Sequence, residues 1–178
     1  MIFLADDMRV TPMSFGAAAF CFGDGSSVAC PCANNGATGR GCQNSAATGG
    51  ALLSASGLPS LAADTLQFTC SGELSSALSI LFQGDATQAT IQMGDGLRCA
   101  GGHLRRMYMK SVVGGVVSAP ALLDPSVSAR SAALGDPIPA NAIRLYHVYY
   151  RDSSAGFCRT PQGNAFNVSN AISILWAP

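Results

Sequence analysis

A chain of 178 residues, 48% of them hydrophobic, is long enough to bury one core and has the size of a single domain. Its ten basic and ten acidic residues cancel and only 11% of the chain is charged, which excludes the basic surface expected of a protein that binds nucleic acid or an anionic membrane. So few charges also weaken the repulsion between copies, which favours self-association or docking onto a larger assembly.

Residues 1–19 are expected to form an N-terminal extension. They begin with four apolar residues, but charged side chains at positions 6, 7 and 9 interrupt the run before it reaches the length of a signal-peptide core. Residues 17–19 are alanines, similar to the small-residue end of such a peptide. No stretch approaches the roughly 18 apolar residues of a transmembrane helix. Export would therefore depend on a signal that these residues do not show.

Residues 20–50 form a Gly-rich segment with almost no large apolar side chains, so hydrophobic burial alone does not hold it. The segment contains four of the seven cysteines, namely Cys21, Cys30, Cys32 and Cys42. The chain has no Cys-x-x-Cys pair, and its only histidines lie far along the sequence, so the spacing is not that of a zinc site. Such a count is typical of a disulfide framework made in an oxidising compartment, with six cysteines paired and one left over.

From residue 51 onward, apolar and polar side chains alternate with the period of two that is typical of half-buried antiparallel strands. Leu66, Phe68 and Cys70 are expected on the buried face of one strand. Further strands are expected over residues 77–83, 90–93, 104–113, 115–118, 126–130 and 143–151, with one strand or a broken pair of strands over 166–176. Gly114 and Gly115 are expected to form a hairpin turn.

These patterns predict an all-β protein, an antiparallel β-sandwich or jelly-roll-like domain over residues 51–178, because no segment shows a sustained helical stripe. The disulfide-stapled Gly-rich loop region 20–50 is expected to brace the sandwich, so that residues 20–178 form one structural unit.

Several short motifs resemble a Cys-rich module found at or near the C-terminus of secreted proteins from planctomycete-type bacteria. The motifs occur in the same order along residues 20–178 and include FCFGDGSSVACPCANNGATGRGCQNS, SALSILFQG, GDGLRCAGG, YHVYYRD and AFNVSNAISILWAP. The resemblance implies export and an extracellular or cell-surface location. It implies no activity, catalytic residue or cofactor, because that family has no assigned function.

The family pattern also implies which cysteines form disulfides. Its counterparts here are Cys21, Cys30, Cys32, Cys42, Cys99 and Cys158. Cys70 is an addition and is expected to be a buried free thiol. We expect Cys99 to pair with Cys158 and the first four cysteines to form two bridges in one of the three orders open to them.

The sequence offers little catalytic equipment. Gly-x-Ser-x-Gly is absent, and Glu73 is the only glutamate beside aspartates that mostly flank glycine or proline. His147 falls within an expected strand and His103 at the start of another, so both are expected to be surface or packed side chains rather than general bases. We therefore predict that the protein is not an enzyme. An enzyme would need a pocket that joins one of these histidines to an aspartate.

Calcium is a weak candidate cofactor, and no other cofactor is expected. Asp24 with Ser26, and Asp95 between two glycines, offer oxygen ligands, but neither run has the spacing of a calcium-binding loop. Both aspartates have the neighbours typical of turn residues.

The strand expected over residues 143–151 supplies the candidate ligand-facing residues. Its alternation places Tyr146 and Tyr150 on one face and His147, Tyr149 and Arg151 on the other. Core packing is expected for both faces. The alternative is that Tyr149, His147 and Arg151 form a platform that stacks on a sugar or contacts a partner.

Together these observations predict a non-catalytic, secreted structural or interaction module of an extracellular or cell-surface assembly. Its partners would be other extracellular proteins or copies of itself. A carbohydrate-binding module is the alternative, and a hydrolase with an unrecognised site is the second alternative.

Overall fold

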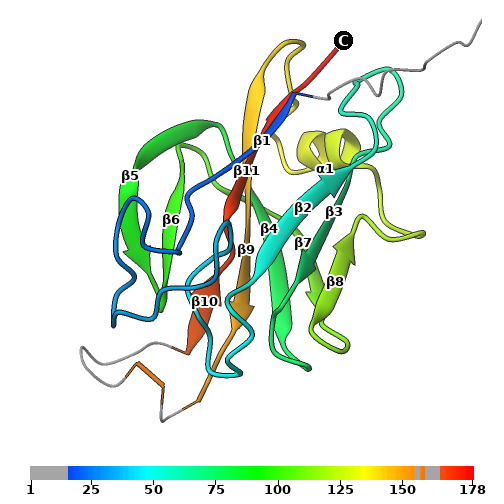
Figure 1. The fold of residues 1–178 in the computed structure, drawn as a ribbon. Helices are drawn as coiled ribbons and strands as arrows, with labels where there is room; N and C mark the ends of the chain where they lie inside the picture. The colour runs from blue at the N-terminus through cyan, green and yellow to red at the C-terminus, as the bar shows by residue number, and fades with distance from the viewer. Residues whose placement is uncertain (1–15, 155–156, 159–164) are drawn as a thin grey trace, which may run out of the picture.

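The computed structural model describes residues 16–154, 157–158 and 165–178 (Figure 1). Within these residues the chain forms antiparallel strands and one short helix, which confirms the all-β prediction. The elements are β1 (Ala17–Phe20), β2 (Leu52–Ser56), β3 (Gln67–Ser71), β4 (Leu78–Gly84), β5 (Ala86–Met93), β6 (Gly96–Gly101), β7 (Arg105–Ser111), β8 (Val116–Ala119), α1 (Val127–Ala133), β9 (Ile143–Arg151), β10 (Phe166–Val168) and β11 (Ala171–Leu175). Because β1 begins at Ala17, residues 17–19 belong to a sheet rather than to the expected extension; residues 1–15 lie outside the described part of the chain.

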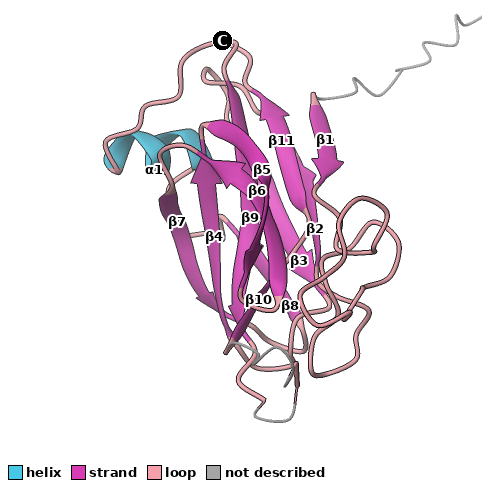
Figure 2. Cartoon of the chain, turned by 90° about the vertical axis from the view of Figure 1, so that its left-hand side faces the viewer, coloured by secondary structure: helices cyan, strands magenta, loops and turns pink. Residues whose placement is uncertain are grey.

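The strands form three layers. The large sheet has the order β1-β11-β9-β4-β7, with β10 also paired to β9. The small sheet, β2-β3-β8, packs on one face of the large sheet, and the β5–β6 hairpin packs on part of the other face. Figures 1 and 2 show the small sheet and the hairpin on opposite sides of the large sheet.

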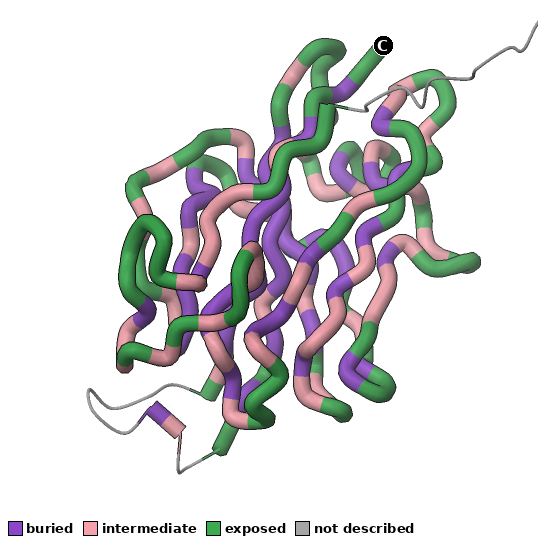
Figure 3. Tube along the Cα trace, in the orientation of Figure 1, coloured by how far each residue is buried: buried purple, intermediate pink, exposed green. Residues whose placement is uncertain are grey.

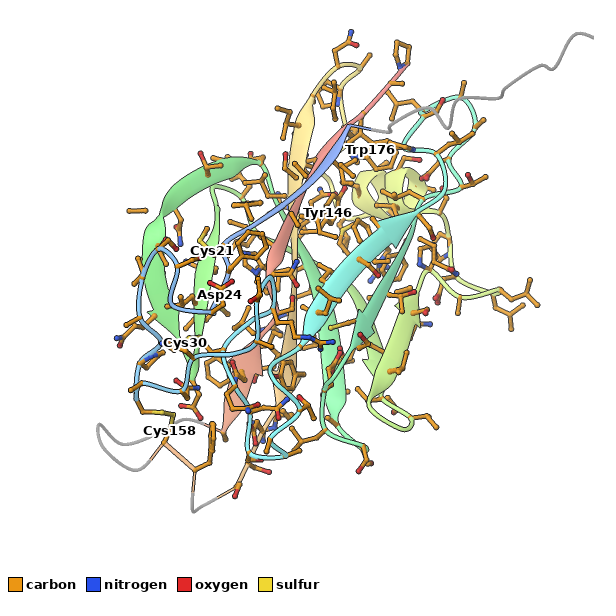
Figure 4. All side chains as sticks on the ribbon, in the orientation of Figure 1. Cys21, Asp24, Cys30, Tyr146, Cys158 and Trp176 are labelled. Carbon is orange, nitrogen blue, oxygen red and sulfur yellow. A yellow bond between two sulfur atoms is a disulfide. The ribbon has the colours of Figure 1, made fainter. Side chains whose placement is uncertain are left out.

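The main core lies between the large and small sheets, where Figure 3 shows buried residues running along the central strands. Trp176 is fully buried there, and its indole N–H donates to the Tyr146 hydroxyl at 3.2 Å (Figure 4). Tyr146 in turn donates to the side-chain oxygen of Gln83 at 2.9 Å. These buried polar groups are therefore satisfied by one another, as a core requires.

Residues 126–130 do not form the expected strand, and that prediction is wrong. Ser126 is the N-cap of α1 and residues 127–130 lie within it, and the helix buries Val127 and Ser131 at a spacing of four residues. The helix start has no cap from its own N-cap side chain. Instead, the carboxylate of Asp64 accepts a hydrogen bond from the Ser128 N–H at 2.7 Å. The local sequence does offer the usual helix-start signal, a serine at the N-cap, but the capping bond itself comes from a distant part of the chain.

Gly114 and Gly115 do form a turn, and both have positive φ. The turn does not close a hairpin of two paired strands, however. Only an isolated bridge joins Val113 to Val116, while β7 pairs with β4 and β8 pairs with β3. The turn therefore carries the chain from the large sheet to the small sheet.

Three disulfides fasten the segment 20–50, which runs along the outside of the hairpin and β10 (Figure 4). The pairs are Cys21–Cys99, Cys30–Cys42 and Cys32–Cys158, and Cys70 is a buried free thiol. The expected bridge between Cys99 and Cys158 is wrong, as is the expectation of two bridges within the first four cysteines. The physical reason is that Cys99, on β6, and Cys158 each lie next to a cysteine of the segment 20–50 in the folded chain.

Glycine lets the segment 20–50 pack backbone against backbone. A Cβ atom on Gly36 would lie 2.0 Å from the carbonyl oxygen of Gly41, and one on Gly41 would lie 2.3 Å from the carbonyl oxygen of Val168. Hydrogen bonds complete the packing, since the Gly36 N–H donates to Gly23 at 2.7 Å and the Asn167 side chain donates to Gln43 at 2.9 Å. The segment is thus held by close backbone contact as well as by sulfur.

Candidate functional site

The hairpin covers only part of the outer face of the large sheet and leaves a cleft of about 600 Å³ beside it. We call it the arginine cleft. Its floor consists of the β4 residues Leu78, Ile80 and Phe82, with Met109 and Tyr149 on the neighbouring strands. Three arginines also line it, namely Arg105, Arg106 and Arg151.

Strand alternation explains why these side chains meet. Ile80 lies opposite Met109 on β7 and opposite Tyr149 on β9, and residues opposite each other in a sheet share a face. Leu78 and Phe82, two residues away on β4, project to the same side. Leu78 is 41% exposed and Met109 is 66% exposed, so the floor is apolar and open to solvent.

A register shift in β7 turns Arg106 toward the cleft. Leu81 pairs with Tyr108, but the next β4 residue, Phe82, pairs with Arg106, which leaves Met107 as an extra residue. Met107 and Tyr108 are both buried in the main core. A bulge of this kind re-aims the side chains that follow it. Here it moves Arg106 onto the same face as Phe82.

Among the described residues, no carboxylate forms an ion pair with the arginines of the cleft. In the part of the chain that the structure describes, the buried Arg105 Nε has no hydrogen-bond partner, and its Nη1 donates to the Leu104 carbonyl at 3.4 Å. Arg106 and Arg151 make no salt bridge within the described part of the chain. The ion pairs there are His103–Asp85, Lys110–Asp124 and Arg144–Asp136. A guanidinium binds a carboxylate through two parallel hydrogen bonds, so the cleft is suited to an anion.

The three candidate ligand-facing residues have different places. Tyr149 and Arg151 line the arginine cleft, and the Tyr149 ring is held against Phe166 with 4.6 Å between ring centroids. The suggestion that His147 faces a ligand is wrong, because His147 is fully buried under the hairpin. Its ring stacks on Phe82 at 5.5 Å, and burial lowers its pKa to about 4.

The second histidine lies next to an aspartate. His103 Nδ1 is 2.8 Å from a carboxylate oxygen of Asp85, and the other oxygen accepts the His103 N–H at 2.7 Å. These bonds lower the pKa of Asp85. The imidazole side chain is 78% exposed, and neither residue lines the arginine cleft. The pair therefore fixes the connection between β6 and β7 at a surface position.

The two candidate calcium aspartates have local partners. Asp24 accepts hydrogen bonds from the N–H groups of Ser26 and Gly39 at 3.0 and 2.9 Å, and bonds from these two residues lower its pKa to about 2 (Figure 4). Asp95 is buried, and its backbone N–H donates to Phe166. Within the residues that the structure describes, no group of three or more His, Cys, Asp or Glu side chains is placed to hold a metal ion.

The sequence analysis placed Tyr149 and Arg151 in a candidate site and missed the other cleft residues, including Arg105, Arg106 and Met109. The one available signal was the break in alternation where two arginines stand side by side at the start of β7.

In the described part of the chain, no helix is long and apolar enough to cross a membrane. Comparison with known proteins found no matching family, no similar curated protein and no similar solved structure.

Proposed function

We propose that the protein is a secreted, non-catalytic interaction module that binds another extracellular protein through the arginine cleft. The observation that carries this proposal is the exposed apolar floor of the cleft together with its three arginines, which no carboxylate of the described residues pairs with. Tyrosine, arginine and methionine are enriched where proteins bind one another, and an apolar centre with a polar rim is the usual layout of such interfaces.

Two observations support the extracellular setting. Three disulfides are typical of proteins made for an oxidising compartment. The resemblance to a module of secreted bacterial proteins points the same way.

Site-specific photocrosslinking tests the proposal. A photoreactive residue at Met109, in the cleft, is compared with one at Leu122, which is 98% exposed and lies outside the cleft. Each protein is incubated with the extracellular fraction of the source cells. We expect one protein to be captured from position 109 only, and to bind the purified module in isothermal titration calorimetry.

The binding measurement is then repeated with Arg106→Glu and Arg151→Glu. Loss of a charge-assisted contact weakens binding by about tenfold, and reversal of the charge by more. Arg98→Glu, on β6 outside the cleft, is the matched control and is expected to leave the affinity unchanged. Equal capture from positions 109 and 122, or equal affinity for all variants, contradicts the proposal.

A second copy of the chain is another candidate partner, which the zero net charge favours. Sedimentation at rising concentration tests it, since a monomer throughout removes this candidate. An acidic glycan is a further candidate, which the Tyr149 ring beside the arginines favours. A change in tyrosine fluorescence with acidic but not neutral oligosaccharides would support a carbohydrate-binding module.

A further inference from the structure

The floor of the arginine cleft repeats at the spacing of an extended peptide. Leu78, Ile80 and Phe82 are alternate residues of one strand, so their side chains lie about 7 Å apart. Alternate side chains of an extended ligand have the same spacing. A peptide lying along β4 therefore meets an apolar position at every second residue.

Arg106 and Arg151 belong to the two strands that flank β4, at opposite ends of this apolar row. Phe82 pairs with Arg106, so Arg106 is at the Phe82 end, on the β7 side. Tyr150 pairs with Ser79, which places Arg151, the next residue of β9, at the Leu78 end. The two arginines are thus separated by four residues along β4, which corresponds to about 13 Å.

Arg105 strengthens the positive charge at one end. It lies opposite Gln83, next to Arg106, and also lines the cleft. Its buried Nε has no partner within the described residues, and a buried donor left in this way is destabilising until an acceptor reaches it. The charge of Arg105 therefore adds to the positive potential at the Phe82 end.

We infer that the cleft binds an extended segment of a partner protein with the pattern acid-x-apolar-x-acid, in which two carboxylates are four positions apart. The inference rests on the proposed function and specifies the partner. The acids meet the arginines at the two ends, and the apolar side chain between them packs on Ile80 and Tyr149.

The partner in this mode is a different protein rather than a second copy. No two of the ten acidic residues of this chain are four positions apart. A copy therefore lacks the segment that the two ends of the cleft require.

Synthetic peptides test the spacing directly. The probe is acetyl-Gly-Thr-Asp-Thr-Leu-Thr-Asp-Thr-Gly-amide. The control is acetyl-Gly-Thr-Asp-Thr-Leu-Asp-Thr-Thr-Gly-amide, which has the same composition with the aspartates three positions apart. Binding to the oxidised full-length protein is followed by NMR chemical shifts at low salt. We expect the first peptide to bind about tenfold more tightly than the second, because only its two carboxylates reach both ends of the cleft.

Variants locate the two contacts. Arg106→Glu and Arg151→Glu are each expected to weaken the first peptide by about tenfold and to remove the preference for its spacing, whereas Arg98→Glu retains both. Equal affinity for the two peptides, or binding of phosphatidylglycerol vesicles in place of either, overturns the inference.

The two proposals fail in different ways. If the peptides do not bind but the crosslinked partner still loses affinity with Arg106→Glu, the acidic pattern is wrong and the interaction module stands. If the partner is insensitive to the cleft variants as well, the proposed function is wrong.

Discussion

Asn170 bonds both backbone groups of Leu53. Its side-chain oxygen accepts the Leu53 N–H at 2.7 Å, and its side-chain nitrogen donates to the Leu53 carbonyl at 3.1 Å. Asn170 is fully buried just before β11, and Leu53 lies on β2, the edge strand of the small sheet. One side chain therefore takes the place of a neighbouring strand and joins the two sheets at this edge.

Asn170→Ala is expected to destabilise the fold by about 3 kcal/mol, because it leaves a buried N–H and a buried C=O of Leu53 without partners. Urea unfolding followed by circular dichroism measures the change. Gln92→Ala, at an exposed position, is the control. A loss no larger than that of the control would mean that the Leu53 groups find other partners.

Gly41→Ala is expected to destabilise the fold by about 2–4 kcal/mol, because the new Cβ overlaps the carbonyl of Val168 and the segment 20–50 must move away from β10. Gly39→Ala is the comparison. Its Cβ meets nothing within 4 Å, and only its positive φ opposes the change, at about 1 kcal/mol. Thermal unfolding of both variants should show a clearly larger decrease in melting temperature for Gly41→Ala than for Gly39→Ala. A larger decrease for Gly39→Ala contradicts the close packing described above.

Glu73 makes stability depend on pH. Burial raises the pKa of this carboxyl to about 7, against the opposing effect of hydrogen bonds from Cys70 and from Ser79, whose hydroxyl donates at 3.0 Å. The folded state therefore favours the protonated acid. The contribution of Glu73 to the free energy of unfolding is fully present below its pKa in the unfolded chain, about 4.5. This contribution is lost as pH rises through about 7, and the loss amounts to about 3 kcal/mol in total.

The measurement is urea unfolding between pH 5 and pH 9, in wild type and Glu73→Gln. We expect the free energy of unfolding of the wild type to fall over this range and that of Glu73→Gln to stay constant. The glutamine amide can still hydrogen-bond Ser79, and it does not ionise. Parallel profiles would show that Glu73 is not the group responsible.

His147 makes stability depend on pH in the opposite direction, because it destabilises the fold as the solution becomes more acidic. Its pKa is lowered to about 4 by burial, so the folded state favours the neutral ring. That contribution is present above the unfolded pKa of about 6.5 and is lost as pH falls through about 4. Between pH 7 and pH 4, the free energy of unfolding of His147→Gln should change less with pH than that of the wild type. The same pH dependence in both proteins contradicts this assignment.

Peptide mapping of the unreduced protein is expected to recover Cys21 with Cys99, Cys30 with Cys42 and Cys32 with Cys158. Cys70 is only 1% exposed, so we expect it to react with iodoacetamide after unfolding but not before. A peptide that links Cys99 to Cys158, or rapid native labelling at Cys70, would contradict the fold.

The sequence predicts the structure best where local pattern and burial agree. The aromatic and β-branched run Ile143–Arg151 is β9 with the expected bounds, because it is buried on both sides by neighbouring layers. β2 and β6 were missed because their small residues carry little strand signal. β6 contains two glycines and an alanine, and it is stabilised by packing over Leu145 and Phe82.

The candidate site was only partly predictable for a different reason. Tyr149 and Arg151 follow from alternation within a single strand. Arg106 reaches the cleft only because Met107 is an extra residue opposite β4, and such a register shift depends on how two strands pair. The disulfide order likewise depends on the path of the folded chain, which brings the segment 20–50 over β6.

The bridge between Cys21 and Cys99 has a consequence for recognition. It ties the N-terminal segment to the same hairpin whose Met93 forms one wall of the arginine cleft. The shape of that wall is thus linked to thiol oxidation, and a newly synthesised, reduced chain has yet to complete it. Under the proposed function, binding by the cleft is therefore expected to depend on that oxidation.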